Sequence, residues 1–260
     1  MMRLNKYISH HSTYSRREAD KAIQDGFVKV DGEVERNPAT QVDEGHANVF
    51  IGGTKVVPNE MFTVIVYNKP RGELVSKKDP RNRRIVYDSL HKEFKHFIPV
   101  GRLDYATEGL LLLTDSPKVA STLMTSQLER VYKVKIKGSV TDAMLESMKS
   151  GLELDDATAG AHKLSKIRSM NFAPFFAYQV IKNSTDYSTL KIAIGEGKNR
   201  EIRRFFAHFG AEVADLRRLA YGGIELNNLP SAKSRYLSRA EYANLREFIK
   251  HQEQKKKERA

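Results

Sequence analysis

Apolar and polar residues alternate along this chain with two different periods, which predict a mixture of strands and helices. Apolar runs that are typical of strands occur at Phe62–Tyr67, Leu110–Leu113, Val131–Ile136, Phe176–Ile181 and Thr189–Ile194. Apolar residues recur at helical spacing at Thr141–Ser150, Arg200–Phe209 and Arg239–Lys250. Because these strands and helices do not alternate regularly, we predict an α+β fold with a mostly antiparallel central sheet.

The start of the chain carries its own set of elements. A short helix is predicted over residues 4–8, where the apolar residues share one face. A second helix is predicted from Ser15–Glu18, which has the spacing of a capping box, to a stop at Gly26. Residues 27–30 then alternate like a strand, and Asp31-Gly32 is a strong hairpin-turn signal. The sequence therefore predicts a small helix–helix–hairpin domain.

Charge is distributed unevenly over the 260 residues. The chain has 44 basic and 32 acidic residues and a formal net charge of +12, but residues 1–60 carry −1 and the rest carries +13. We divide the chain into a small domain at residues 1–60, a larger domain at 61–250, and a basic tail at 251–260 that we expect to be disordered. A strongly basic domain favours a polyanionic partner such as nucleic acid.

Several classes of protein are disfavoured by what the sequence lacks. The absence of cysteine excludes disulfides, thiolate metal sites and a cysteine nucleophile. The chain has neither a signal-peptide pattern at its start nor an apolar run long enough to cross a bilayer. We therefore expect a cytoplasmic protein without a membrane partner.

One segment, residues 98–115, brings candidate chemistry to the end of a predicted strand. The triplet Arg102-Leu103-Asp104 lies between an apolar approach and the run Leu110–Leu113. A carboxylate in a turn at such a position is partly removed from water and can still meet a ligand. For a lone aspartate, a turn cap or a simple ion pair is the alternative.

This segment is similar to the catalytic motif of pseudouridine synthases, which isomerise uridine within RNA. Gly101–Asp104 and Thr107–Leu111 match the pattern of the branch that modifies bacterial ribosomal RNA, residue by residue. Two further blocks agree in order, Asn68–Leu74 with Lys78–Pro80 before the motif and Gly197–Arg204 after it. The resemblance covers nearly the whole chain and implies that the larger domain is the synthase domain.

The resemblance assigns roles to five residues. It implies that Asp104 is the catalytic carboxylate and that Arg203 is its partner, which we expect to hold both carboxylate oxygens. Tyr132 corresponds to the active-site tyrosine, whose ring can stack on a flipped base, and Ile202 is expected to form an apolar wall. Arg102 is expected to fill the gap left in the RNA stack, with a structural ion pair as the alternative. The reaction needs no metal and no other cofactor.

Other basic residues near the motifs are expected to bind RNA phosphates. Arg200 and Arg204 lie where a helix is predicted to start, and helix N-termini favour anions. Lys69 and Arg71 open a basic loop before the Asp104 segment, and we expect this loop to contact the RNA backbone.

The small domain also resembles a known RNA-binding family. Its segment from Ser15 to Gly32 is similar to the alpha-L (S-four-like) RNA-binding domain, in which the second helix presents basic side chains to RNA. This resemblance implies RNA contacts for Arg16, Arg17 and Lys21. A solvated helical face is the alternative for these three side chains.

The sequence blocks are most similar to those of enzymes that modify the RNA of the large ribosomal subunit. We therefore expect 23S ribosomal RNA as the partner, and we expect the protein to be a monomer. The same reaction on 16S ribosomal RNA or on a tRNA is an alternative. A non-catalytic RNA-binding ribosome-assembly protein is another, because such proteins also carry the small domain. An aminoacyl-tRNA synthetase is disfavoured, since Lys163–Lys166 is similar to one of its signature loops but the His-x-Gly-His partner is missing.

Overall fold

The structure, a computed structural model, describes residues 1–43, 45–57, 61–162 and 164–258. The chain divides into two compact units. The first unit comprises Met1–Thr63 with Asp115–Val119, and the second comprises Val64–Thr114 with Ala120–Ala260. The boundary that we expected near residue 60 lies outside the described residues, as do the last two residues of the expected tail.

The first unit is built from two short helices and small antiparallel strands. Its elements are β1 (Met2–Arg3), α1 (Leu4–His11), α2 (Arg16–Gln24), β2 (Val28–Val30), β3 (Glu33–Val34), β4 (Gln41–Val42), β5 (Val49–Ile51) and β6 (Thr54–Lys55). The capping box is formed, because the Ser15 hydroxyl and the Glu18 carboxylate each accept a hydrogen bond from the other residue's amide. Asp31 and Gly32, with φ angles of 51° and 97°, turn the chain from β2 into β3. The predicted helix–helix–hairpin arrangement is confirmed.

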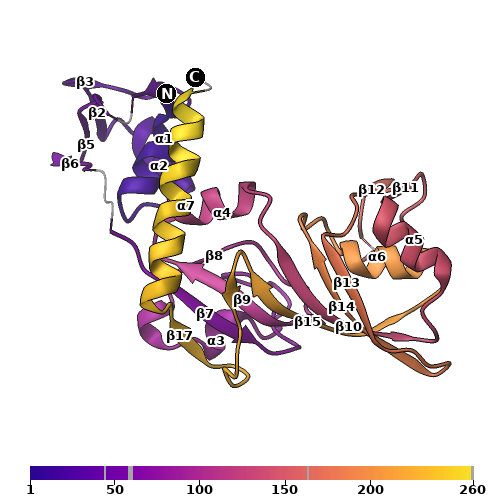
Figure 1. Cartoon of the computed structure of the whole chain (residues 1–260). Helices are drawn as coiled ribbons and strands as arrows, with labels where there is room; N and C mark the ends of the chain where they lie inside the picture. Colours follow the sequence, from indigo (N-terminus) through magenta and orange to yellow (C-terminus); the bar gives the residue numbers. More distant parts are fainter. Residues whose placement is uncertain (44, 58–60, 163, 259–260) are drawn as a thin grey trace. The chain divides into compact units, whose positions relative to one another are not determined.

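A nine-stranded sheet organises the second unit (Figure 1). Its strands are β7 (Val64–Lys69), β8 (Ile98–Pro99), β9 (Glu108–Thr114), β10 (Arg130–Lys137), β13 (Ala177–Lys182), β14 (Tyr187–Ile194), β15 (Val213–Tyr221), β16 (Ile224–Glu225) and β17 (Ser234–Tyr236). The order is β13-β14-β10-β15-β9-β7-β17, with β16 paired to β15 and β8 paired to β9. Among these pairs β15 with β9 is parallel and the others are antiparallel. The predicted α+β fold with a mostly antiparallel central sheet is confirmed.

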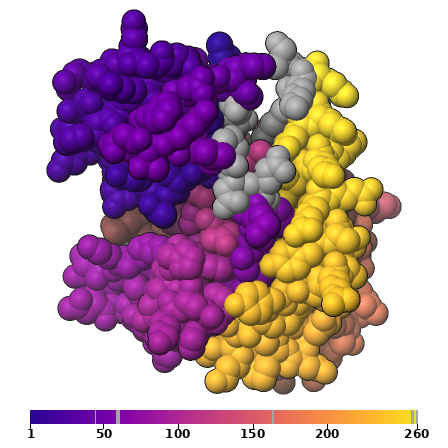
Figure 2. All heavy atoms as spheres, turned by 90° about the vertical axis from the view of Figure 1, so that its left-hand side faces the viewer, coloured from indigo at the N-terminus to yellow at the C-terminus, as the bar shows by residue number. Residues whose placement is uncertain are grey.

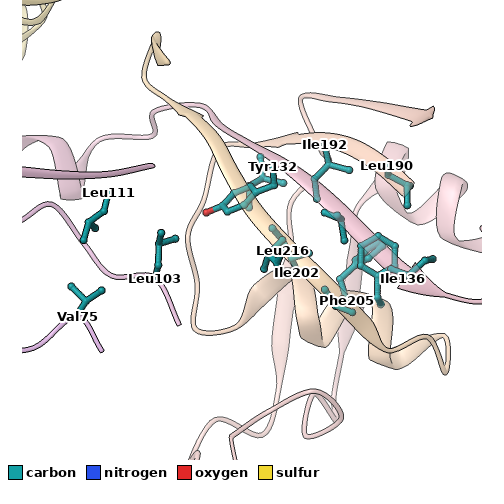
Figure 3. Packing of buried hydrophobic residues seen from close by; sticks show 14 of the residues in the cluster. Val75, Leu103, Leu111, Tyr132, Ile136, Leu190, Ile192, Ile202, Phe205 and Leu216 are labelled. Atoms are coloured by element: carbon teal, nitrogen blue, oxygen red, sulfur yellow. The ribbon is translucent and has the colours of Figure 1, made fainter. Parts of the chain in front are cut away.

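Helices cover one face of the strands β10 and β14. The remaining elements of the chain are α3 (Val86–Ser89), the short 3-10 helix η1 (Lys92–Phe94), α4 (Pro117–Thr125), α5 (Asp142–Ser150), β11 (Leu152–Leu154), β12 (Met170–Phe172), α6 (Glu201–His208) and α7 (Arg239–Glu258). Met144 of α5 and Phe205 of α6 belong to one buried cluster with Val134 and Leu190 of the sheet. Part of this cluster is shown in Figure 3, and the placement of α5 and α6 can be followed in Figure 1.

The C-terminal helix is longer than predicted. α7 runs from Arg239 to Glu258, whereas the apolar periodicity predicted an end at Lys250. The prediction of a disordered tail at 251–260 is therefore wrong for residues 251–258. Glutamine, glutamate and lysine are good helix formers, so the helix continues past its last buried apolar residue, Ile249. Figure 2 shows the surface of this helix in yellow.

Lys69, the last residue of β7, is completely buried. Its ammonium donates hydrogen bonds to the backbone oxygens of Pro70 (2.9 Å) and Thr107 (2.8 Å). The expectation that Lys69 contacts RNA is therefore wrong, because its side chain ties β7 to the loop that carries Asp104. Burial lowers the pKa of Lys69 to about 8, against the opposing attraction of nearby carboxylates, of which Glu73 has the largest effect.

Gly109 lets β9 approach β15 closely beside the same loop. It has a φ of +104°, which side chains rarely adopt, and a Cβ added there would collide with the backbone of Arg218. Arg218 is the residue paired with Gly109 in the parallel register. Its Nε also donates a hydrogen bond to the backbone oxygen of Leu110 (2.7 Å). The glycine of the Thr-x-Gly-Leu-Leu pattern is thus required by the backbone.

Replacing Lys69 with methionine tests what burial of the ammonium costs. Because the pKa of Lys69 is about 8 when folded against an ordinary value of 10.5, the unfolded chain binds more protons between these two values. The lysine's contribution to stability should therefore rise by about 3 kcal/mol across this pH window. Denaturant unfolding from pH 7.5 to 10.5 should show this rise in the wild type and in the exposed-site control Lys29→Met, but not in Lys69→Met. If the free energy of unfolding changed with pH in the same way in all three proteins, the lowered pKa of Lys69 would be contradicted.

Gly109→Ala tests the close approach of β9 to β15. Gly210→Ala is the matched control, because Gly210 also has a positive φ (+74°) but no atom lies within 4 Å of the added Cβ. We expect the control to lose about 1 kcal/mol and Gly109→Ala roughly 3 kcal/mol, since only the latter must displace backbone. Equal losses in a denaturant titration would show that φ alone, and not the contact with Arg218, requires glycine at this position.

Candidate active site

Asp104 lies in the loop between β8 and β9. Its backbone oxygen accepts a hydrogen bond from the Thr107 amide (3.0 Å), which closes a tight turn. Leu103 and Thr107 are both buried and anchor this loop, whereas the Asp104 side chain remains 29% exposed. A carboxylate held in this way is partly shielded from water and can still be reached by a ligand.

Two arginines approach the Asp104 carboxylate. Oδ2 of Asp104 lies 3.7 Å from Nη1 of Arg200 and 3.9 Å from Nε of Arg203. Both distances are longer than a hydrogen bond, and Nε of Arg203 has no hydrogen-bond partner among the described residues. The expected bidentate pair between Arg203 and Asp104 is therefore wrong. Arg200, for which we expected a phosphate contact, lies as close to the carboxylate as Arg203 does.

The guanidinium of Arg203 holds backbone instead. It donates hydrogen bonds to the backbone oxygens of Val213 (3.0 Å) and Ala106 (3.1 Å) and to the Thr107 hydroxyl (3.5 Å). Burial lowers the pKa of Arg203, and the neighbouring positive charge of Arg200 adds to this effect. Arginine nevertheless stays protonated in proteins. Arg203 therefore fixes the Asp104 loop and places positive charge beside the carboxylate.

The start of α6 brings both arginines to this loop. Arg200 has a left-handed backbone conformation (φ 52°) immediately before the helix. The buried Glu201 carboxylate accepts a hydrogen bond from the Lys198 amide (2.9 Å), and burial raises the pKa of Glu201. Nε of Arg200 donates a hydrogen bond to the backbone oxygen of Gly160 (2.7 Å), where an added Cβ would meet the Arg203 backbone. A close backbone contact thus sets the helix start.

Arg204 is a structural residue. Its side chain is completely buried and donates hydrogen bonds to the backbone oxygens of Asn199 (3.0 Å) and Ala157 and to the Ser165 hydroxyl (2.8 Å). The expectation that Arg204 binds RNA phosphate is therefore wrong. Because a buried guanidinium is costly unless its donors are used, these bonds hold the segment around Ala157 and Ser165 against α6.

Three of the residues around the site belong to the buried core of the second unit. Leu103, Tyr132 of β10 and Ile202 of α6 belong to one buried cluster, and Figure 3 shows the Tyr132 phenol oxygen on the side that faces Leu103. Leu103 precedes Asp104 and Ile202 precedes Arg203 in the chain, so the same two segments supply both the cluster and the charged groups. Asp104 lies within 4 Å of Arg200 and Arg203, and Leu103, Tyr132 and Ile202 come to the same cluster from three separate elements.

Two other expected RNA contacts, Arg71 and Arg102, lie at the surface near the same loop. Arg102 is exposed. The Arg71 guanidinium forms an ion pair with Asp215, lies 3.9 Å from Oε2 of Glu108, and donates a hydrogen bond to the backbone oxygen of Ala214 (3.3 Å). Arg71 therefore remains accessible, but its charge is shared with two carboxylates.

The basic residues of α2 are exposed in the first unit. Arg16, Arg17 and Lys21 face solvent, whereas Ala19 and Ile23 of the same helix are buried in the core of the unit. Nη2 of Arg16 also donates a hydrogen bond to the Asn5 side chain (3.3 Å). RNA contact through this helix stays a prediction, with the solvated face as its alternative.

Thr107 is the residue of the site to which we assigned no role. It accepts hydrogen bonds from Lys69 through its backbone and from Arg203 through its hydroxyl. Its fixed spacing from Asp104 in the motif was the signal that could have identified it.

The described residues offer neither a metal site nor a membrane-spanning helix. Within the described ranges, no group of three or more histidine, aspartate and glutamate side chains could hold a metal ion. In the same part of the chain, none of the helices combines the length and the apolar character needed to cross a membrane.

Comparisons with known proteins identify the family and agree with the fold. Residues 63–208 match the family described as RNA pseudouridylate synthase, and residues 2–48 match the S4 domain. The chain is 49% identical over 250 residues to a Helicobacter pylori protein named "Uncharacterized RNA pseudouridine synthase", with 95% of each chain covered. It is 32% identical over 253 residues to "Ribosomal large subunit pseudouridine synthase B" of Bacillus subtilis, covering 96% of this chain and 98% of that protein. A crystal structure of a pseudouridylate synthase shares the fold, with a TM-score of 0.63 at 23% identity, covering 94% of this chain and 100% of that one.

These similarities favour an enzyme over the alternatives of a non-catalytic assembly protein and an aminoacyl-tRNA synthetase. Lys163, in the stretch that is similar to a synthetase signature, lies outside the described residues. The family match covers more than half of the chain, and relatives with over 30% identity cover nearly all of it. The chain therefore belongs to the RNA pseudouridylate synthase family, with an S4 domain at its start, and is an enzyme that isomerises uridine to pseudouridine in RNA.

Proposed function

We propose that Asp104 is the catalytic carboxylate of this isomerisation and that the substrate is 23S ribosomal RNA. The observation that carries the first part is the partly exposed Asp104 carboxylate beside Arg200 and Arg203. Leu103 of the same loop belongs to the buried cluster that includes Tyr132 and Ile202.

The reaction sets clear demands on such a site. The bond between C1′ of the ribose and N1 of the uracil breaks, the base turns, and a bond from C1′ to C5 forms while C5 loses a proton and N1 gains one. A carboxylate can assist by attacking the sugar, by attacking the ring, or by removing a ribose proton. All three routes need a carboxylate oxygen that can reach the substrate.

The arrangement around Asp104 meets that demand. Arg203 uses its hydrogen bonds on Val213, Ala106 and Thr107, so it attracts the carboxylate without occupying its oxygens. A bidentate pair would instead direct both oxygens at the guanidinium. We propose that Arg203 acts as a positioning residue that also supplies charge, and that Arg200 contributes a second positive charge.

The substrate base must leave the RNA stack to reach this loop. We propose that the flipped uracil lies against Tyr132 and Ile202, because aromatic and apolar side chains favour a base that is removed from water. The exposed Arg102, next to Leu103, is suited to fill the gap that the base leaves. Beyond the target nucleotide, we propose RNA backbone contacts for Arg71 and for the α2 residues Arg16, Arg17 and Lys21.

The choice of 23S ribosomal RNA rests on similarity. The Bacillus subtilis relative is named for the large ribosomal subunit, and the sequence blocks before the Asp104 loop are most similar to enzymes of that kind. A 16S ribosomal RNA or tRNA target is the alternative. The expected cytoplasmic location, the monomeric state and the lack of a cofactor stay predictions.

Asp104→Asn tests the role of the carboxylate. The amide keeps the size of the side chain but removes its charge and nucleophilicity, so turnover should fall by at least about a hundredfold. Tritium release from C5-labelled uridine in a 23S transcript measures turnover, and filter binding should show retained RNA affinity. Asp142→Asn, on the exposed first turn of α5, is the control with the same loss of charge. Wild-type turnover by Asp104→Asn would remove Asp104 from the mechanism.

The target is tested in cells. We expect one or more pseudouridines of 23S ribosomal RNA to disappear when this gene is deleted, and to return with the wild-type gene but not with Asp104→Asn. Chemical mapping of pseudouridine across 23S, 16S and transfer RNA measures all targets together. Loss of a site in 16S ribosomal RNA or in a tRNA, with 23S unchanged, would overturn the target but leave the reaction intact.

A further inference from the structure

A row of positive charges crosses three neighbouring strands of the sheet in the second unit. Lys133 of β10 is paired directly with Lys191 of β14 on one side and with Arg217 of β15 on the other. Directly paired residues in antiparallel strands project to the same face, and neighbouring strands lie about 4.8 Å apart. Three cations therefore stand next to one another on one face.

This face is opposite to the one that carries the tyrosine of the site. Along β10, Tyr132 and Val134 are buried in the cluster that includes α5 and α6, and Lys133 between them is exposed. Successive side chains of a strand alternate between the two faces. Met144 of α5 and Phe205 of α6 belong to the same buried cluster as Tyr132, so the exposed Lys133 row belongs to the other face of the sheet. The two helices can be followed in Figure 1.

Few carboxylates balance the row. Among the described residues, Lys133 and Lys191 take part in no ion pair, and Nε of Arg217 lies 4.0 Å from Oε1 of Glu108. Glu108 also faces Arg71 at 3.9 Å, so its charge is shared. Like charges directly opposite each other destabilise a sheet. An arrangement of this kind is stabilised when an anion binds to it.

The neighbouring row extends the surface and adds an aromatic ring. Lys135 is paired with Thr189 and Asp215, and its ammonium lies 4.4 Å from the ring centroid of Tyr187. Tyr187 is 40% exposed on the same face. Although Asp215 lies opposite Lys135 in the strand register, its carboxylate forms an ion pair with Arg71, and the Lys135 ammonium contacts the Tyr187 ring instead. Exposed lysines that alternate with an aromatic side chain are typical of surfaces that bind nucleic acid.

We propose that this face, defined by Lys133, Lys135, Lys191, Arg217 and Tyr187, is a second RNA-binding surface of the enzyme. Its partner is the phosphate backbone of the substrate RNA outside the target nucleotide, bound without regard to sequence. RNA is favoured over an acidic protein because the known substrate is already a polyanion and because protein interfaces place apolar residues at their centre. The proposal rests on 23S ribosomal RNA as substrate only for the choice of one probe below.

The test uses the full chain with Lys133→Gln and Lys191→Gln combined. Lys92→Gln with Lys149→Gln is the control, because these lysines are also exposed and the net charge changes equally. Affinity for a 20-base-pair RNA duplex is measured by filter binding between 0.05 and 0.3 M salt. Loss of two phosphate contacts should make the negative slope of log affinity against log salt less steep by about 1.8. Affinity at 0.1 M salt should fall by up to about sixtyfold.

The second readout is kcat/KM on the 23S transcript, which should fall in parallel with affinity in the Lys133/Lys191 variant and stay at the wild-type value in the control. A slope equal to that of the control would overturn the proposed surface, as would an equal loss in both variants, which would indicate only a change in net charge. If the wild type makes no pseudouridine in 23S RNA but the slopes differ as expected, the target is wrong and the surface stands.

Discussion

Two cations, the fully buried Lys69 and the largely buried Arg203, hold the backbone of the Asp104 loop, and the other features of the site depend on this. Lys69 donates to the Thr107 oxygen, and Arg203 donates to the Ala106 oxygen and to the Thr107 hydroxyl. A loop at the surface of a protein is ordinarily mobile, because its backbone groups can exchange partners with water. Here charged donors with little access to water bind these oxygens, and such hydrogen bonds are stronger than neutral ones. The carboxylate is therefore held in place through its backbone and is left with long contacts of its own.

The sequence predicted that Arg203 and Asp104 lie close together but assigned the wrong contacts to several of the site residues. Arg203 and Arg204 are adjacent, and consecutive residues of a helix project about 100° apart, so one of them had to face away from Asp104. The helix start decides which one does, and that start depends on the left-handed Arg200 and on its contact with Gly160. Gly160 lies forty residues earlier in the chain. A pattern of charges along the sequence does not show which residues forty positions apart come into contact. The burial of Lys69 was not predicted for the same reason, because it depends on the distant Thr107.

In the sheet, too, some strands could be predicted from their own sequence, whereas another strand depends on partners that are distant in the chain. β10 was predicted because its apolar residues alternate at the spacing of a strand, and β9 because Leu110–Leu113 is a continuous apolar run. β15, which lies between them, was not predicted, because Asp215, Arg217 and Arg218 interrupt its apolar pattern. Arg218 is nevertheless buried, with one hydrogen bond to the Leu110 oxygen and its guanidinium 5.2 Å from the ring centroid of Tyr221. Partners from strands distant in sequence therefore determine the conformation of β15, against its own composition.

Strand β10 connects the two proposed surfaces, and its register constrains both. A slip by one residue would bring Lys133 into the apolar cluster and would move Tyr132 away from Leu103 and Ile202. Eight consecutive residue pairs with β14 hold β10 without interruption, whereas its pairing with β15 shifts register between Val131 and Tyr132 and again between Lys135 and Ile136. Both irregularities thus lie in the pairing with β15, one of them next to the tyrosine, and the regular pairing with β14 keeps Tyr132 and Lys133 on opposite faces. Because one strand carries both Tyr132 and Lys133, RNA bound at the lysine row would contact the same strand that positions the tyrosine ring.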